Sequence, residues 1–261
     1  MKLYLVRHGR SAGNLPGRMT GWSDHSLTPL GAAQAERVAE RLATLGPMPI
    51  YASDLPRALE TAARIAARWP RGAGAEAAVG VQPDRRLREI DLGDYEGRSW
   101  DDFTADRELA AAFAREPLAT RLPGGESLAL VRERVIAAFD EIVAGDPQAA
   151  CLVSHDGPIR TILNHVLHVP QERHWAISTS HGGLSLLETG ERWVSVRFVN
   201  DTSHLWGLDA GQAGDGEVAT GEVAPGEAAP GEAATVEAAT VEAGPALSDE
   251  GEAPARAIEG L

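Results

Sequence analysis

An arginine and a histidine stand side by side where the first apolar run of the chain ends, as Arg7 and His8. A second apolar run, 149–154, is followed directly by His155, and a third short run leads into a segment that carries Arg57. Guanidinium groups match phosphate oxygens with paired hydrogen bonds, and a neutral imidazole can attack phosphorus. Two imidazoles and two guanidiniums at one place would therefore suit the transfer of a phosphoryl group.

The residue types fit each other electrostatically. Nearby guanidinium charges disfavour the imidazolium form, so a nucleophilic histidine stays unprotonated. A phosphoryl group in transfer carries spread negative charge, which fixed cations stabilise without a metal ion. No resident metal or organic cofactor is therefore expected. Taken singly, the Arg-His pair could be a surface feature and His155 a hydrogen-bonded core residue. Their joint occurrence at equivalent strand ends favours a shared site, and Gly9 is interpreted as letting the backbone turn away from the ligand.

Segments of strand type alternate along the chain with segments of helix type. Expected strands cover 2–6, 49–52, 77–81, 149–154, 184–188 and 192–198, and expected helices cover 28–45, 55–69, 99–114, 126–144 and 158–167. The helix at 28–45 has the clearest signals, with Thr28 as N-cap and Pro29 at the first helical position. The alternation predicts a three-layer α/β fold, with a mostly parallel central sheet and helices on both faces. Such sheets bind ligands outside the carboxyl ends of their strands, which is where Arg7, His8 and His155 would meet.

The composition changes near residue 209. Eleven acidic residues and one base, Arg256, lie within 210–261, and they supply most of the net charge of −14. Glutamates recur there every five positions from Glu217 to Glu242, a period that fits neither a helix face nor a strand face. We predict a catalytic domain over 1–208 and a disordered acidic tail rich in Gly, Ala, Glu and Pro over 209–261. A tail that binds a partner is the alternative.

Other features narrow the class of protein. The single cysteine, Cys151, lies in an apolar run, which predicts a buried thiol and excludes a disulfide framework. The first apolar run is too short for a signal peptide, and no run approaches the length of a membrane span. We therefore expect a cytoplasmic protein with no membrane association. The globular part has no basic surplus, so no nucleic-acid partner is expected. Oligomeric state stays open.

Six blocks of the sequence resemble the histidine phosphatase superfamily, also called phosphoglycerate mutase-like proteins, in the order that the family has them. The blocks are LVRHGRSAGN, GWSDHSLTPLGAAQAE, ASDLPRALETA, LREIDLGDYEG, PGGES and LVSHDGPIR. NDTSHL resembles the end of the family's catalytic domain, so the resemblance covers roughly 2–207. One block would be weak evidence, whereas six in order are specific.

The resemblance implies a role for each core residue. His8 takes the place of the family's nucleophile, Arg7 and Arg57 that of its phosphate-binding arginines, Glu89 that of its proton donor, and His155 that of its second histidine. His8 would attack phosphorus and form a covalent phosphohistidine. Glu89 would protonate the leaving oxygen and then activate water, which requires a carboxyl kept partly protonated by burial or by the nearby phosphate.

Five further positions match the family around the substrate. Asn14 matches a position near the phosphate, and Ser11 stands where serine or threonine occurs. Thr20, Gly21 and Trp22 match a loop that lies near substrate in relatives.

Two acidic neighbours of the core residues are given structural roles instead. Glu96, before a glycine in an expected turn, is interpreted as solvated or structural. Asp156 is interpreted as the cap of the helix that begins near Pro158, and a contact with substrate is the alternative.

The branch of the family is predicted from the context of Glu89. LREIDLGDYEG, with a short following helix and PGGES soon after, resembles the small phosphatases more than the phosphoglycerate mutases, whose proton donor has an ERHYG-like context. We predict a metal-independent phosphomonoester hydrolase that acts on a small phosphorylated metabolite. A phosphoglycerate mutase-type phosphoryl transfer is the alternative, and a non-catalytic phosphate-binding protein is the third. The leaving group stays open; loops around 20–25, 100–125 and 170–182 are expected to select it, and Trp100 and Trp175 lie in them.

Overall fold

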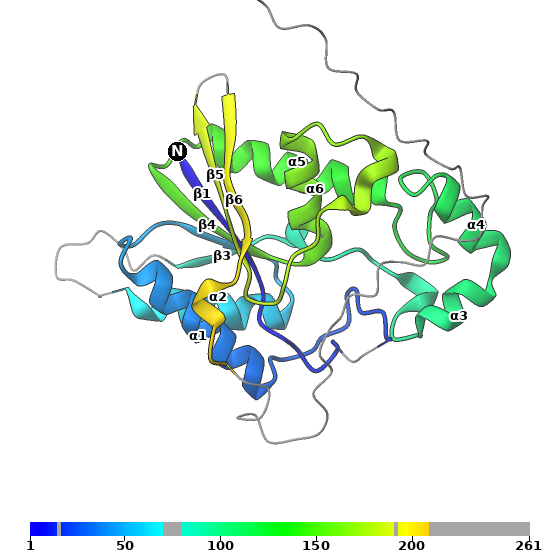
Figure 1. Cartoon of the computed structure of the whole chain (residues 1–261), viewed down its shortest axis with the longest axis horizontal. Helices are drawn as coiled ribbons and strands as arrows, with labels where there is room; N and C mark the ends of the chain where they lie inside the picture. The colour runs from blue at the N-terminus through cyan, green and yellow to red at the C-terminus, as the bar shows by residue number, and fades with distance from the viewer. Residues whose placement is uncertain (15–16, 70–79, 191–192, 209–261) are drawn as a thin grey trace, which may run out of the picture. The chain divides into compact units, whose positions relative to one another are not determined.

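The computed structural model describes residues 1–14, 17–69, 80–190 and 193–208. Their strands form one six-stranded sheet in the order β3-β2-β4-β1-β5-β6 (Figure 1). The strands are β1 (Lys2–Arg7), β2 (Ile50–Ala52), β3 (Val81–Pro83), β4 (Ala149–Ser154), β5 (Leu184–Gly190) and β6 (Trp193–Asp201). Neighbours among β3, β2, β4 and β1 pair in parallel, whereas β5 is antiparallel to both β1 and β6. The predicted mostly parallel sheet is confirmed.

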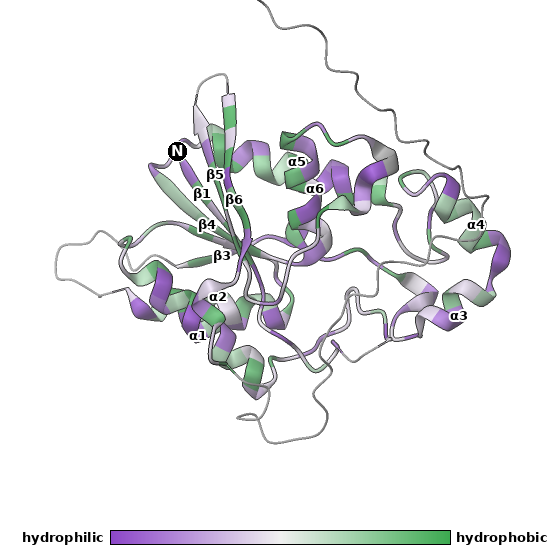
Figure 2. Ribbon diagram, viewed as in Figure 1, coloured by the Kyte–Doolittle hydropathy of each residue, from purple (hydrophilic) through white to green (hydrophobic). Residues whose placement is uncertain are grey.

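Helices cover both faces of this sheet. The helices are α1 (Pro29–Ala43), α2 (Pro56–Arg68), α3 (Trp100–Ala105), α4 (Arg107–Arg115), α5 (Leu128–Ala144) and α6 (Asp156–Val166), with short 3-10 turns η1 (Arg85–Leu87), η2 (Gly93–Tyr95), η3 (Gln171–Ala176) and η4 (Ser203–Leu205). Successive side chains of a strand point to opposite faces. Accordingly Tyr4 and Val6 pack with α1 and α2, while Leu3 and Leu5 pack with α5 and α6. Both hydrophobic and hydrophilic residues occur along α1 and α2 (Figure 2).

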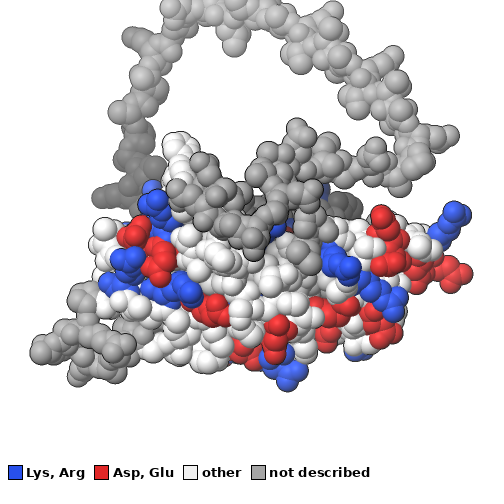
Figure 3. All heavy atoms as spheres, turned by 90° about the horizontal axis from the view of Figure 1, so that it is seen from below, with Lys and Arg blue, Asp and Glu red and all other residues white. Residues whose placement is uncertain are grey.

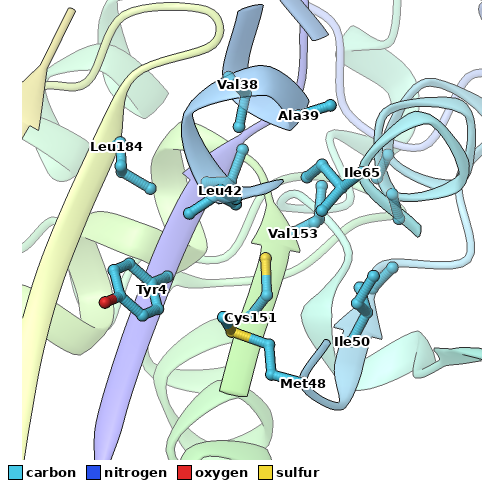
Figure 4. Packing of buried hydrophobic residues seen from close by; sticks show 14 of the residues in the cluster. Tyr4, Val38, Ala39, Leu42, Met48, Ile50, Ile65, Cys151, Val153 and Leu184 are labelled. Atoms are coloured by element: carbon cyan, nitrogen blue, oxygen red, sulfur yellow. The ribbon is translucent and has the colours of Figure 1, made fainter. Parts of the chain in front are cut away.

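The core beneath α1 and α2 contains the single cysteine. Cys151 is fully buried, in a cluster that includes Leu42, Met48 and Ile50 (Figure 4). Each fully buried aliphatic side chain of this kind stabilises the fold by about 1.5–3 kcal/mol relative to exposure. Burial raises the pKa of the Cys151 thiol to about 12, so the thiol stays protonated. The predicted buried thiol is confirmed.

The start of α1 explains a glycine next to His8. Thr28 caps the helix by accepting from the Gly31 backbone N–H, with Pro29 at the first position, as predicted. A Cβ atom on Gly9 would lie 2.1 Å from the Gly31 carbonyl oxygen. Gly9 is therefore required by the close approach of the β1 exit to α1, and this replaces the interpretation that it turns the backbone away from a ligand.

Several predicted elements have different bounds in the structure. The helix expected at 99–114 is divided into α3 and α4 at Asp106, because the Asp106 side chain accepts from the Leu109 N–H and so begins a new helix. The strand expected at 77–81 has residues 77–79 outside the described part, and β3 covers Val81–Pro83. Helix α6 begins at Asp156, two residues before Pro158.

A third apolar cluster lies apart from the two sheet cores. It contains Met19, Leu92, Tyr95, Phe103 and Leu122, with Phe113 packed against it. The predicted acidic tail over 209–261 lies outside the described residues. Among the helices that the structure describes, none is both long and apolar enough to span a bilayer. On the face in Figure 3, acidic and basic side chains are interspersed.

Candidate active site

The carboxyl ends of three parallel strands bring the predicted residues together. In the sheet register Arg7 lies opposite Ser154, and Ala52 lies opposite Val153. His8, Ser53 and His155 therefore leave the same edge at adjacent positions. The rings of His8 and His155 stand edge to face, with their centroids 4.8 Å apart.

His8 is held with one ring nitrogen free. Its side chain is buried, and Nδ1 lies 2.6 Å from the carbonyl oxygen of Gly9. Because a carbonyl only accepts, Nδ1 carries the ring proton and Nε2 keeps its lone pair. This is the tautomer that a nucleophilic Nε2 requires.

His155 and Arg57 form a buried pair. The Arg57 Nε–H donates to Nδ1 of His155 at 3.2 Å, and the imidazole Nε2 lies 2.8 Å from the Ser53 hydroxyl. The terminal nitrogens of Arg57 donate to the carbonyl oxygens of Ser23 and Gly21. A guanidinium has five N–H donors, so each terminal nitrogen retains one more.

Arg7 has an unsatisfied donor. One terminal nitrogen, Nη1, donates to the Thr179 carbonyl and lies 3.9 Å from Oδ1 of Asp156. The other, Nη2, lies 3.2 Å from Nε2 of His181. The Nε–H is buried with no hydrogen-bond partner among the described residues. Orphaned buried donors are rare in folded proteins. An anion at this edge would satisfy it.

His181 adds a third imidazole to the site. This position of His181 was not predicted from the sequence. Its ring centroid is 5.5 Å from that of His8. His181 precedes β5, whose first residue Leu184 pairs with Val6 at the end of β1. The amino end of an antiparallel strand lies at the same edge as the carboxyl ends of its parallel neighbours, so the position of His181 before β5 is the signal that could have found it.

The three histidines are kept neutral. Burial, followed by His181, Arg57 and Arg7, holds the pKa of His8 well below its ordinary value. Burial and Arg57 do the same to the pKa of His155, and burial and Arg7 to that of His181. A neutral imidazole is the form that can attack phosphorus. The depressed pKa values therefore favour a nucleophile ready at neutral pH.

Glu89 lies beside the histidines, half-buried. Its Oε2 accepts from the Gly157 backbone N–H at 3.2 Å, two residues beyond His155, and its Oε1 accepts from Ile90. The Glu89 carbonyl accepts from the Trp22 ring N–H and from Arg134, which fixes the backbone. Trp22 thus helps to fix the backbone of Glu89 through its ring N–H.

The other predicted binding residues shape the loops around the site. Ser11 donates through its backbone N–H and its hydroxyl to Oδ1 of Asn14. The Thr20 hydroxyl donates to the Gly13 carbonyl, and the Gly21 carbonyl holds Arg57. Of these, the structure places Gly21 in direct contact with a core residue.

Glu96 has the structural role that the sequence predicted for it. Its carboxylate accepts from the backbone N–H groups of Gly21, Trp22 and Ser23. The loop it holds carries the carbonyls that bind Arg57. Glu96 therefore positions Arg57 through the backbone.

Asp156 does not cap the helix, and that prediction is wrong. The N-cap of α6 is His155, and Asp156 is the first helical residue. Its carboxylate accepts from the N–H and hydroxyl of Thr179 and bonds Arg160. Arg160 lies four positions after Asp156 on the helix, so their side chains meet. Thr179 supplies better-placed donors to the Asp156 carboxylate than the helix end does.

Cationic and imidazole donors thus converge at the edge of a mostly parallel α/β sheet, the class of fold that binds phosphate there. Residues 3–202 match the histidine phosphatase superfamily (branch 1). The chain belongs to this superfamily, as the resemblance indicated, and is an enzyme of the histidine phosphatase type.

The names of two relatives state different activities, one a mutase and the other a phosphatase. The chain is 32% identical over 213 residues to a probable phosphoglycerate mutase GpmB of Salmonella paratyphi C, a match that covers 78% of this chain and 95% of that protein. Bacillus stearothermophilus YhfR is 29% identical, with a TM-score of 0.68 over 78% of this chain and 98% of that one. The mycobacterial glucosyl-3-phosphoglycerate phosphatase Rv2419c, solved with VO3, is 31% identical, with a TM-score of 0.65 over 76% and 98%.

Proposed function

We propose that the protein hydrolyses a phosphomonoester through a covalent phosphohistidine at His8. The observation that carries this proposal is the free Nε2 lone pair of the buried His8, set among Arg7, Arg57 and His155. Arg7 also keeps an unsatisfied buried N–H at this edge. Two guanidiniums that can pair with phosphoryl oxygens and a neutral imidazole that can attack phosphorus together suit a phosphoryl group.

In the first step, Nε2 of His8 attacks phosphorus and the bond from phosphorus to the leaving oxygen breaks. Glu89 gives its proton to that oxygen, so that an alcohol leaves. Arg7 and Arg57 hold non-bridging oxygens while negative charge spreads over them, and His155 binds one of these oxygens by exchanging its Ser53 partner for it. Hydrogen bonds from charged donors to these oxygens are stronger than neutral ones.

In the second step, the Glu89 carboxylate takes a proton from water, whose oxygen attacks the phosphohistidine. The bond from nitrogen to phosphorus breaks, inorganic phosphate leaves and His8 recovers its lone pair. A mutase would instead pass the phosphoryl group back to a bound phosphorylated acid. We favour water because the Glu89 context resembles the small phosphatases. The substrate is proposed to be a small phosphorylated metabolite in the cytoplasm.

The test is phosphate release from a panel of phosphomonoesters without added metal, for the wild type and His8→Ala. His165→Ala, which changes a histidine outside the site, is the matched control. Release by the wild type and the control, and none by His8→Ala, is expected. Primer-dependent isomerisation of 3-phosphoglycerate without phosphate release would make the protein a mutase. Equal turnover by His8→Ala would refute the covalent route, and a silent wild type would favour the non-catalytic alternative.

A further inference from the structure

A cavity of about 200 Å³ lies beside Glu89, the proposed proton donor to the leaving oxygen. Its lining includes Glu89 and Gly157, so it is continuous with the proposed site. Much of the remaining lining is aliphatic, including Ile90, Leu92, Leu122 and Leu128.

One wall of the cavity is a row of aromatic rings from three elements. Trp100 and Phe103 of α3 have centroids 5.4 Å apart, Phe103 and Phe113 of α4 are 5.6 Å apart, and Phe113 and Trp175 of η3 are 6.1 Å apart. Trp100 and Trp175 leave 53% and 51% of their surface exposed. Large half-exposed aromatic side chains around a cavity mark a surface that another apolar group covers.

The cavity offers no unpaired cation among its described lining residues. Arg160 is the basic residue there, and its guanidinium bonds Asp156 and the Ile177 carbonyl. The same guanidinium stacks 4.8 Å from the Trp175 ring centroid. Glu89 adds a carboxyl group and no cation. A leaving group with a carboxylate or a second phosphate would therefore meet acidic groups and a cation that is already bound.

We propose that this cavity binds the leaving group and that the substrate class is a phosphomonoester of an apolar alcohol, with one aromatic ring or an alkyl chain of about six carbons. This inference rests on the proposed function. The size follows from the volume, because an apolar cavity of about 150 Å³ holds one benzene molecule. Trp100, Phe113 and Trp175 are then the residues that determine specificity.

The first test is a series of n-alkyl phosphates from ethyl to hexyl, with glycerol 3-phosphate and 3-phosphoglycerate as charged or polar comparators. The alkyl esters have nearly equal chemical reactivity, so differences report binding in the cavity. Each added methylene should raise kcat/KM about fourfold until the cavity is full. Hexyl phosphate should exceed both comparators. A flat series, or 3-phosphoglycerate as the best substrate, would overturn the inference.

The second test removes part of the wall. Trp100→Ala should lower the ratio of kcat/KM for hexyl phosphate to that for ethyl phosphate by about tenfold, since a lost apolar contact surface is worth that much discrimination. The matched control is Trp206→Ala, which changes a tryptophan that is 81% exposed and does not line the cavity. An unchanged ratio in Trp100→Ala, or an equal fall in the control, would contradict the assignment.

Phosphoramidate separates this inference from the proposed function on which it rests. It is a small phosphoryl donor without an apolar group, so it should label His8 whatever the cavity binds. Labelling of His8 with a flat alkyl series would leave the phosphohistidine mechanism standing and reject the apolar substrate class. Absence of both labelling and ester hydrolysis would reject the two together.

Discussion

Gly157 controls the position of the proposed acid, and replacing it with alanine should remove acid catalysis without unfolding the protein. A Cβ atom at this position would lie 2.2 Å from Oε1 of Glu89 and 3.3 Å from its Cδ. Ordinary contacts begin near 3.5 Å, so the carboxyl group has to move by about 1 Å. The obstructing atoms are the end of a flexible side chain, so the displacement is cheap for the fold.

The expected effect is selective for the leaving group. A misplacement of about 1 Å costs roughly 100-fold in a positioned catalytic step. In Gly157→Ala, kcat/KM for hexyl phosphate should fall by about this factor, because kcat/KM reports the steps up to release of the alcohol and excludes hydrolysis of the phosphohistidine. For p-nitrophenyl phosphate, whose phenolate leaves without needing a proton, the fall in kcat/KM should stay under about tenfold. Glu89→Gln should give the same pattern.

Gly145→Ala is the matched control. Gly145 ends α5 with φ −67°, and its nearest neighbour to an added Cβ is 3.5 Å away, so alanine fits there. The assay is steady-state kinetics with both esters, with a thermal melt of each variant. Equal losses in kcat/KM on the two esters, or full alkyl-ester turnover by Gly157→Ala, would refute the assignment of Glu89 as an acid held against Gly157.

Three further outcomes are expected. The free energy of unfolding should fall as the pH drops below about 6.5, by up to about 1.4 kcal/mol per pH unit for each buried site histidine. The cause is that the unfolded chain binds protons which the folded imidazoles, with their depressed pKa values, do not bind. Urea melts at pH 7.5 and 5.5 measure this difference, and equal stability at the two pH values would contradict it. Glu96→Gln should lower the free energy of unfolding by about 2 kcal/mol, because its hydrogen bonds to three backbone N–H groups become weaker. The control Glu133→Gln, at an exposed position, should change it little. Equal unfolding free energies of the two variants would contradict the role of Glu96. Removal of 209–261 should leave kcat unchanged, and a large loss would show that the tail takes part in catalysis.

The strand ends could be predicted because local patterns fix them. Apolar runs of strand length, separated by helical segments, place Arg7, His8 and His155 at one sheet edge through the rules for parallel sheets. Glu89 could not be reached in this way. It lies between η1 and η2, outside the sheet, and only its resemblance to the family's proton-donor segment indicated it.

The remaining site residues depend on contacts between distant segments. His181 reaches His8 because β5 joins the sheet next to β1, about 180 residues along the chain, and antiparallel to it. Asp156 bonds Thr179, which lies 23 residues further along the chain, and a helix-cap pattern does not include such a contact. The sequence indicated loops with Trp100 and Trp175, but the direction of the Trp175 ring follows from its contacts with Phe113 of α4 and Arg160 of α6.

The covalent intermediate at His8 is the central claim, and trapping it is the most direct test. The protein would be mixed with phosphoramidate, quenched at alkaline pH, where phosphohistidine survives, and analysed by intact mass and by mapping of the N-terminal peptide. The account predicts one phosphoryl group on the peptide that contains His8, removed by mild acid and absent from His8→Ala. Phosphate release without any adduct, or an adduct that persists in His8→Ala, would contradict it.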